Sequence, residues 1–200
     1  MSTITSPPPT IPPPVPAVPP VLYRMTVDEY ERIGQLLDDP RVELIDGYMV
    51  KKMSKNPEHS FTTCELFQAM DTRLPAGWTR RQEQPVRIPD YDEPEPDIAI
   101  IRGRNADYRH RMPTAADVTL LVEVSGSSLS QDRGEKLSAY AKAGIPVYWI
   151  VNLVDRQVEV YTGPGPAGYQ SRQVYPAGDN VPVVIDGQPR APIAVNDILP

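Results

Sequence analysis

Two acids and one lysine in the middle of the chain have the types and spacing that could do chemistry together. Glu123 lies inside the apolar run 120–125, and Asp97 follows Pro96 at the start of the apolar run 97–101. A carboxylate in an apolar strand is costly unless it is paired, hydrogen-bonded or bound to a metal. Glu123 therefore needs a partner, and Asp97 is the best candidate upstream.

These two acids predict a metal site if their strands are neighbours. Successive side chains of a strand point to opposite faces, so strands in register would bring Asp97 and Glu123 together on one face. Two close carboxylates repel each other unless one takes up a proton or a cation lies between them. Mg²⁺ prefers oxygen ligands, lowers the pKa of a bound water and stabilises charge that develops on a phosphodiester.

Lys136 is the third member of this group. It follows Glu123 by one turn of chain and about one turn of helix, so it could orient a water and offset negative charge. Asp132 precedes it by four residues. An exposed helix ion pair, worth about 0.2–0.5 kcal/mol, is therefore an alternative explanation for this lysine.

Composition limits the class of protein. The chain has 200 residues, of which 40% are hydrophobic and 23% charged, as expected for one globular domain. Its net charge of -6 argues against an electrostatic grip on nucleic acid over the whole surface, but not against a local basic cleft. One cysteine and two histidines argue against disulfides and a zinc site. With no signal peptide and no membrane-length apolar run, we expect a soluble, cytoplasmic protein without a membrane partner.

The first twenty residues differ from the rest. Many of the 25 prolines lie there, and proline removes backbone donors and fixes φ. We expect residues 1–20 to be a disordered polyproline-II-like tail and residues 21–200 to be the folded domain. A solvated leader explains such a tail better than a ligand for an aromatic groove does.

Local signals place helices and strands in the order α, β-hairpin, α, β, β, α, β, β. A capping box at Thr26 starts a helix to about Leu37, and Asp46-Gly47 joins two strands into a hairpin. The other expected elements are a helix from Asn56 to about residue 74, strands at 78–88 and 96–101, a helix at 130–144, a hairpin at 147–153 and 157–161, a strand at 181–185 and a loose end at 198–200. This order predicts an α/β fold, more exactly an α+β mixed sheet flanked by helices.

Several stretches in this order resemble the Uma2-type family of restriction-endonuclease-like nucleases. They are Glu43-Leu44-Ile45-Asp46-Gly47, His59 at a helix start, Pro96-Asp97, Leu121-Val122-Glu123-Val124, Asp132-Arg133-Gly134-Glu135-Lys136-Leu137, Tyr140, Gly144-Ile145-Pro146 and Tyr148-Trp149-Ile150-Val151. The resemblance covers roughly residues 23–160. It implies a restriction-endonuclease-like central mixed sheet, Mg²⁺-dependent phosphodiester cleavage with Mn²⁺ as a substitute, and DNA as the substrate.

The resemblance also implies roles for single residues. Asp97 and Glu123 become metal ligands, Glu43 an additional catalytic acid, and Lys136 a migrated form of the catalytic lysine. The wider superfamily places lysine two residues after the glutamate, where this chain has Ser125. Members of the closer family often have serine at the next position, where this chain has Gly126, although a serine follows at 128.

Several polar residues also have structural explanations that need no role in the reaction. Glu43 could pair across its hairpin with Lys51 or Lys52, and Asp97 could cap a turn or pair with Arg102. His59 is a candidate for substrate binding or a polar residue at the rim of the site. Arg102 and Arg104 belong to the basic loop 102–111, which could clamp phosphates or be a solvated loop.

The leading expectation is a Mg²⁺-dependent DNA endonuclease in which a metal-activated water attacks the phosphodiester. The alternative is a nucleic-acid-binding or protein-binding module that keeps the nuclease fold without the chemistry. Cleavage of both DNA strands would favour a homodimer. A third hypothesis gives the proline-rich tail the task of recruiting a partner.

Overall fold

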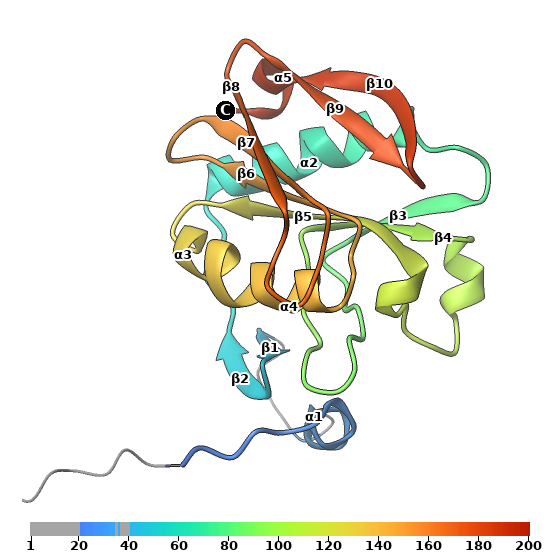
Figure 1. Ribbon diagram of the computed structural model, residues 1–200, viewed down its shortest axis with the longest axis vertical. Helices are drawn as coiled ribbons and strands as arrows, with labels where there is room; N and C mark the ends of the chain where they lie inside the picture. Colours follow the sequence, from blue (N-terminus) through green and yellow to red (C-terminus); the bar gives the residue numbers. More distant parts are fainter. Residues whose placement is uncertain (1–20, 35, 37–40) are drawn as a thin grey trace, which may run out of the picture.

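A six-stranded mixed sheet forms the centre of the molecule (Figure 1). We describe a computed structural model, and the residues it describes are 21–34, 36 and 41–200. The predicted tail at 1–20 and the predicted helix end near Leu37 lie outside them. The strands, in spatial order, are β3 (Trp78–Gln82), β4 (Ile98–Arg102), β5 (Val118–Ser125), β6 (Val147–Asn152), β7 (Gln157–Thr162) and β8 (Ser171–Pro176).

The fully buried strand β5 positions the candidate site. It pairs antiparallel with β4, Ile98 opposite Val122, and parallel with β6, Glu123 opposite Ile150. One residue before Ile98, Asp97 therefore stands at the level of Glu123. A parallel pair needs a long crossover, and the segment between β5 and β6 supplies one that is mostly helical.

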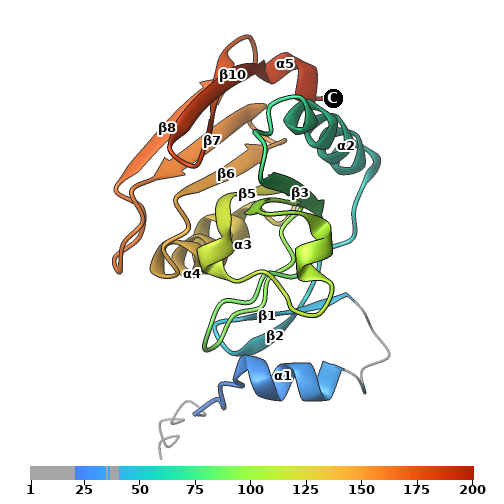
Figure 2. The ribbon, with the colours of Figure 1, turned by 90° about the vertical axis from the view of Figure 1, so that its right-hand side faces the viewer.

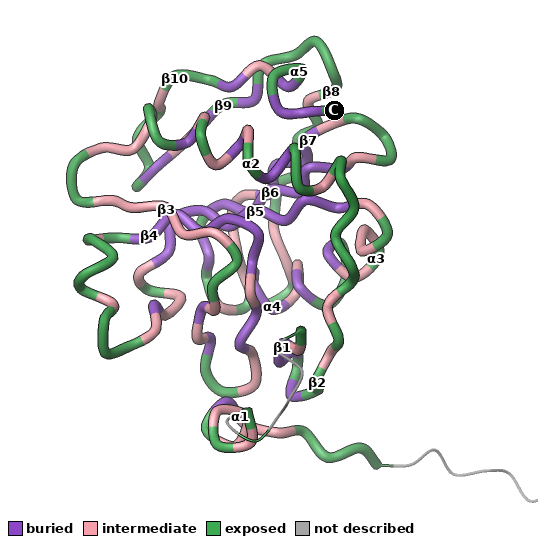
Figure 3. Tube along the Cα trace, turned by 180° about the vertical axis from the view of Figure 1, so that it is seen from behind, coloured by how far each residue is buried: buried purple, intermediate pink, exposed green. Residues whose placement is uncertain are grey.

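Each face of the sheet has its own apolar core and cover. On one face, α2 (Pro57–Asp71), α5 (Val195–Ile198) and the hairpin of β9 (Asn180–Ile185) and β10 (Gln188–Ala194) pack over alternate residues of β4, β5 and β6. The helical crossover covers the other face, where Tyr140 and Ile145 pack on Leu121. Figure 2 shows the sheet between these two covers, and Figure 3 shows the buried trace concentrated in it.

The helical crossover contains a π-turn. It consists of α3 (Leu129–Gln131), five π-helical residues (Asp132–Lys136) and α4 (Leu137–Lys142). It ends before Gly144, whose φ of +76° suits glycine. π-turns insert an extra residue into a helix and often lie at functional sites. Here the π-helical segment begins at Asp132 and ends at Lys136.

The N-terminal elements form a small lobe below the sheet (Figures 1 and 2). It comprises α1 (Val27–Gly34) and the hairpin of β1 (Val42–Ile45) and β2 (Tyr48–Lys51). Asp46 and Gly47 both have positive φ, as the predicted Asp-Gly turn requires. Backbone hydrogen bonds between Leu44 and Glu93 join the lobe to the segment before β4.

The mixed sheet flanked by helices and the hairpins at Asp46-Gly47 and after β6 confirm the predicted architecture. Some details differ. The helix after Asn56 ends at Asp71, and the strand predicted at 78–88 ends at Gln82. The loose end predicted at 198–200 is wrong: Ile198 and Leu199 are buried in the core, where apolar burial outweighs the entropy of the chain end.

Candidate active site

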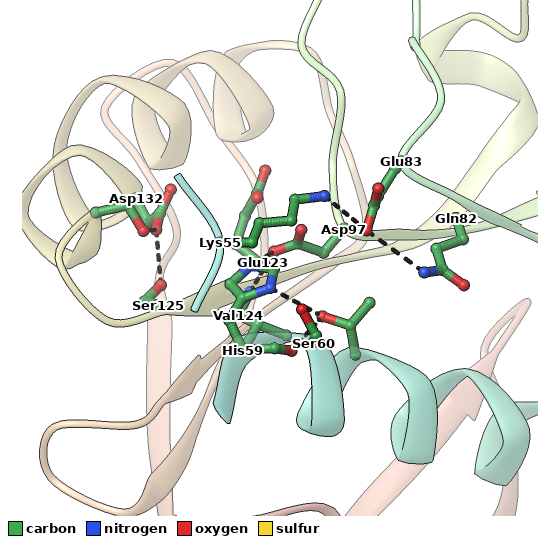
Figure 4. A network of polar contacts seen from close by, with 12 residues as sticks. Lys55, His59, Ser60, Gln82, Glu83, Asp97, Glu123, Val124, Ser125 and Asp132 are labelled. Atoms are coloured by element: carbon green, nitrogen blue, oxygen red, sulfur yellow. Dashed lines mark hydrogen bonds and ion pairs between the residues drawn. The ribbon is translucent and has the colours of Figure 1, made fainter. Parts of the chain in front are cut away.

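Acidic side chains from separate parts of the chain line one cavity at the level of Glu123. They come from β1, from the segment before β4, from β5 and from the π-turn. The set consists of Glu43, Glu83, Glu95, Asp97, Glu123 and Asp132, together with Lys52, Lys55, Lys136 and His59. The structure thus brings Glu43, Asp97, Glu123 and Lys136 to one place, and Figure 4 shows the part around Asp97.

Glu123 is one of the buried acids that line this cavity. Its Oε1 accepts hydrogen bonds from the Tyr140 hydroxyl at 2.7 Å and from Lys136 Nζ at 3.1 Å. Burial raises its pKa well above the ordinary range, against the lowering effect of Lys136, and three neighbouring carboxylates raise the pKa further. This acid is oriented by two donors, yet its surroundings oppose its charge.

Lys136 joins two acids from different lobes. Its Nζ lies 3.1 Å from Glu43 Oε1 and 3.1 Å from Glu123 Oε1, whereas Asp132 Oδ1 is 4.0 Å away. Burial lowers the pKa of Lys136, but Glu123 and Glu43 outweigh it, so the pKa is raised and the amine stays charged. With a side chain only 7% exposed, Lys136 is not half of a surface ion pair.

Glu43 and Asp97 are each fixed by a backbone amide. Glu43 Oε2 accepts from the amide of Glu95 at 3.1 Å, and Asp97 Oδ2 accepts from the amide of Val124 at 2.7 Å. The amide after Glu123 thus ties Asp97 to the strand that carries Glu123.

Two basic residues that could have paired with these acids pair with other acids instead. Lys52 pairs with Glu95, and Arg102 pairs with Asp186 at 3.2 Å.

His59 lies beside Asp97, with its Nε2 at 3.1 Å from Asp97 Oδ2. It sits in the first turn of α2, where Asn56 caps the helix by accepting from the His59 amide at 2.8 Å. Arg102 and Arg104 do not line the cavity. Arg102 stacks on Trp78 and Arg104 pairs with Asp107, so their contact with DNA stays a prediction.

Asp132 is a further acid of the site that the sequence pattern presents only as a neighbour of Lys136. Its Oδ2 accepts from the hydroxyls of Ser125 and Ser128, both at 2.7 Å. Burial raises its pKa, partly offset by Lys136 and by these serines. Ser125 thus holds the turn that carries Lys136.

The donor set suits a hard divalent cation, because carboxylate oxygens crowd a cavity that contains one buried ammonium. Yet among residues 21–34, 36 and 41–200, no three His, Cys, Asp or Glu side chains converge into a metal cluster. The nearest arrangement places Lys136 Nζ between Glu43 and Glu123.

In the same described ranges, no helix is long and apolar enough to cross a membrane.

The mixed sheet with helical covers agrees with the restriction-endonuclease-like fold expected from the sequence. A family model described as "Uma2: Putative restriction endonuclease" matches residues 27–189, and the chain belongs to this family. No curated protein matches the chain. Among solved structures it is similar to "a putative nuclease belonging to DUF820 from Anabaena variabilis ATCC 29413". The two chains share 18% identity at a TM-score of 0.69, over 87% of this chain and 97% of the other. This likeness shows the fold.

Proposed function

We propose that the protein is a Mg²⁺-dependent endonuclease that hydrolyses phosphodiester bonds of DNA. One observation carries the proposal: a buried lysine joins Glu43 and Glu123 in a cavity that Asp97 also lines. Membership of the Uma2 family and the fold shared with the DUF820 protein, described as a "putative nuclease", support it.

Asp97 and Glu123 would hold the metal, with Glu43 as the adjacent acid. A bound Mg²⁺ supplies Lewis-acid stabilisation of charge on the phosphodiester and lowers the pKa of a water, and Mn²⁺ can replace it. Hydrolysis adds one water across a P–O bond and leaves a phosphate end and a hydroxyl end.

The chain's own residues orient this reaction. Val124 N–H and His59 fix the Asp97 carboxylate, and the Tyr140 hydroxyl fixes that of Glu123. Lys136 makes two short contacts to carboxylates, so its third N–H is left for a water or a phosphate oxygen in the cavity. Its positive charge stabilises the negative charge that develops on the phosphate.

Nicking of supercoiled plasmid DNA tests the proposal. We expect conversion to open circles with Mg²⁺ or Mn²⁺, none with EDTA, and none from Asp97→Ala or Glu123→Ala. Activity that survives both substitutions would refute the assignment of the site.

A second candidate is a DNA-binding module without chemistry. The lack of a converged metal cluster in the described residues favours it. It predicts metal-independent binding of DNA and no nicking with any divalent cation.

A further inference from the structure

The connector between β2 and α2 carries two lysines to the mouth of the cavity. Lys52 pairs with Glu95, and Lys55 Nζ lies 2.6 Å from Glu83 Oε1. Both lysines and both acids line the cavity. Figure 4 shows the Lys55 side chain reaching past Asp97 to Glu83.

Glu95 and Glu83, the partners of these lysines, are hydrogen-bonded through their backbone amides to Glu43 and Asp97. The amide of Glu95 donates to Glu43 Oε2 at 3.1 Å, and the amide of Glu83 donates to the Asp97 carbonyl at 3.2 Å. Lys52 is therefore held on the Glu43 side of the site and Lys55 on the Asp97 side. The two ammonium groups are thus held next to different acids of the site.

A polyanion meets an electrostatic obstacle at this mouth, since six carboxylates line the cavity and the chain carries a net charge of -6. The third lysine of the lining, Lys136, is only 7% exposed and faces inward to its acids. By contrast, the side chains of Lys52 and Lys55 are 25% and 37% exposed. They are therefore the lysines of this lining that are open to phosphates next to the scissile one.

We propose that Lys52 and Lys55 bind DNA phosphates next to the scissile bond, leaving Glu95 and Glu83 when the duplex arrives. This rests on the proposed function, because it assumes that DNA is the substrate. Partly exposed ion pairs contribute little free energy, whereas a lysine on a DNA phosphate also releases counterions. The exchange of carboxylate for phosphate is therefore favourable.

Salt dependence of binding tests the proposal. The full chain carrying Glu123→Gln, in EDTA, is titrated against a fluorescent 30-bp duplex, so that neither cleavage nor divalent ions interfere. The log–log slope of affinity against salt should become shallower by about 0.9 for Lys52→Ala and for Lys55→Ala. Lys51→Ala removes the same charge next to Lys52 but outside the cavity lining, and it should leave the slope unchanged.

Glu83→Gln provides a test of opposite sign. It removes the carboxylate that competes for Lys55 and should tighten duplex binding, about threefold more than the control Glu58→Gln does at the same salt. Glu58 lies in the first turn of α2 outside the cavity lining. A purely structural Lys55–Glu83 pair would instead make both Lys55→Ala and Glu83→Gln weaken binding, and Lys55→Arg should retain the wild-type slope.

Unchanged slopes for both lysine variants, weaker binding by Glu83→Gln, or no duplex binding would each overturn the proposal. Plasmid nicking by the wild-type chain is measured separately. Shallower slopes without nicking would leave the phosphate contacts standing and reject the nuclease. Nicking with unchanged slopes would support the nuclease and reject the phosphate contacts.

Discussion

Two buried glutamates occupy the same row of the sheet and have opposite surroundings. Ile150 of β6 pairs with Glu123 of β5 on one side and with Glu159 of β7 on the other. Both acids therefore point to the same face, the one that the helical crossover covers. They are 4% and 0% exposed, so burial alone does not distinguish a candidate catalytic acid from a structural one.

Their partners do distinguish them. Glu159 accepts from Arg133, Arg172 at 3.1 Å, Asn152 at 3.0 Å and Tyr161 at 2.7 Å. Burial raises its pKa, but these donors outweigh it and lower the pKa to about 2. Glu123 has one lysine, one tyrosine hydroxyl and three neighbouring acids, and its pKa is raised. A charge that the fold satisfies is structural, whereas a charge left under-compensated beside a cavity is available to a cation or substrate.

The largest difference is expected in catalysis. Glu123→Gln should reduce plasmid nicking with Mg²⁺ by more than about 100-fold, because it removes a proposed metal ligand. Glu159→Gln should retain activity within about tenfold, since Glu159 does not line the cavity and affects it through Arg133, the neighbour of Asp132 in sequence. Equal loss in both variants, measured as initial nicking rates, would erase the distinction.

Folding stability should show the reverse order. Glu159→Ala leaves two arginines without their buried acid and should lower the free energy of unfolding by about 3 kcal/mol. Glu123→Gln should change it by less than about 1 kcal/mol, because the lost contact with Lys136 is offset by relief from neighbouring carboxylates. Urea denaturation followed by tryptophan fluorescence measures both, and a larger loss for Glu123→Gln would contradict the comparison.

The pH dependence of stability should differ in sign. The folded pKa of Glu159 is lowered from 4.5 to about 2, so its contribution is complete above pH 4.5 and is lost as the pH falls toward 2. The raised pKa of Glu123 works oppositely: stability decreases as the pH rises from its unfolded pKa toward its folded one. The advantage of wild type over Glu159→Gln should therefore vanish in acid, as denaturation at several pH values will show.

The smallest effect concerns metal in the absence of DNA. A ligand that binds only the folded state stabilises it, so Mg²⁺ at ten times its Kd should raise the melting temperature by about 2–4 °C. Glu123→Gln should abolish this shift and Glu159→Gln should keep it. A shift that persists in Glu123→Gln would place the cation elsewhere.

The elements around Glu123 could be predicted from sequence because their signals are local. An acid inside an apolar strand, a proline before Asp97 and an Asp-Gly turn each indicate structure within a few residues. The register of β4 and β5 then follows the alternation of side chains, which places Ala99, Ile101 and Leu121 on one face as expected.

The role of Glu159 could not be predicted in this way. Its strand alternates apolar and polar residues, a pattern typical of one solvent-facing side, yet the helical crossover covers that side. Its arginine partners are 26 and 13 residues away in sequence. For Lys136, the sequence left a surface pair with Asp132 open beside the catalytic role, because helical spacing does not reveal that a π-turn directs both residues inward.

This π-turn has a consequence for how the lysine and the acid are aligned. In a strand, a lysine two positions after Glu123 would have its direction fixed by pleating, whereas here Ser125 takes that position and Lys136 lies on a helix. Its direction depends on rotational phase, about 100° per residue, and the inserted residue sets that phase. Removing Gly134 would restore an α-helical count and rotate Asp132 relative to Lys136 by about 100° without altering the strand. The direction of Lys136 is thus set by helical periodicity and that of Glu123 by strand periodicity, and the residue inserted in the π-turn brings the two side chains together.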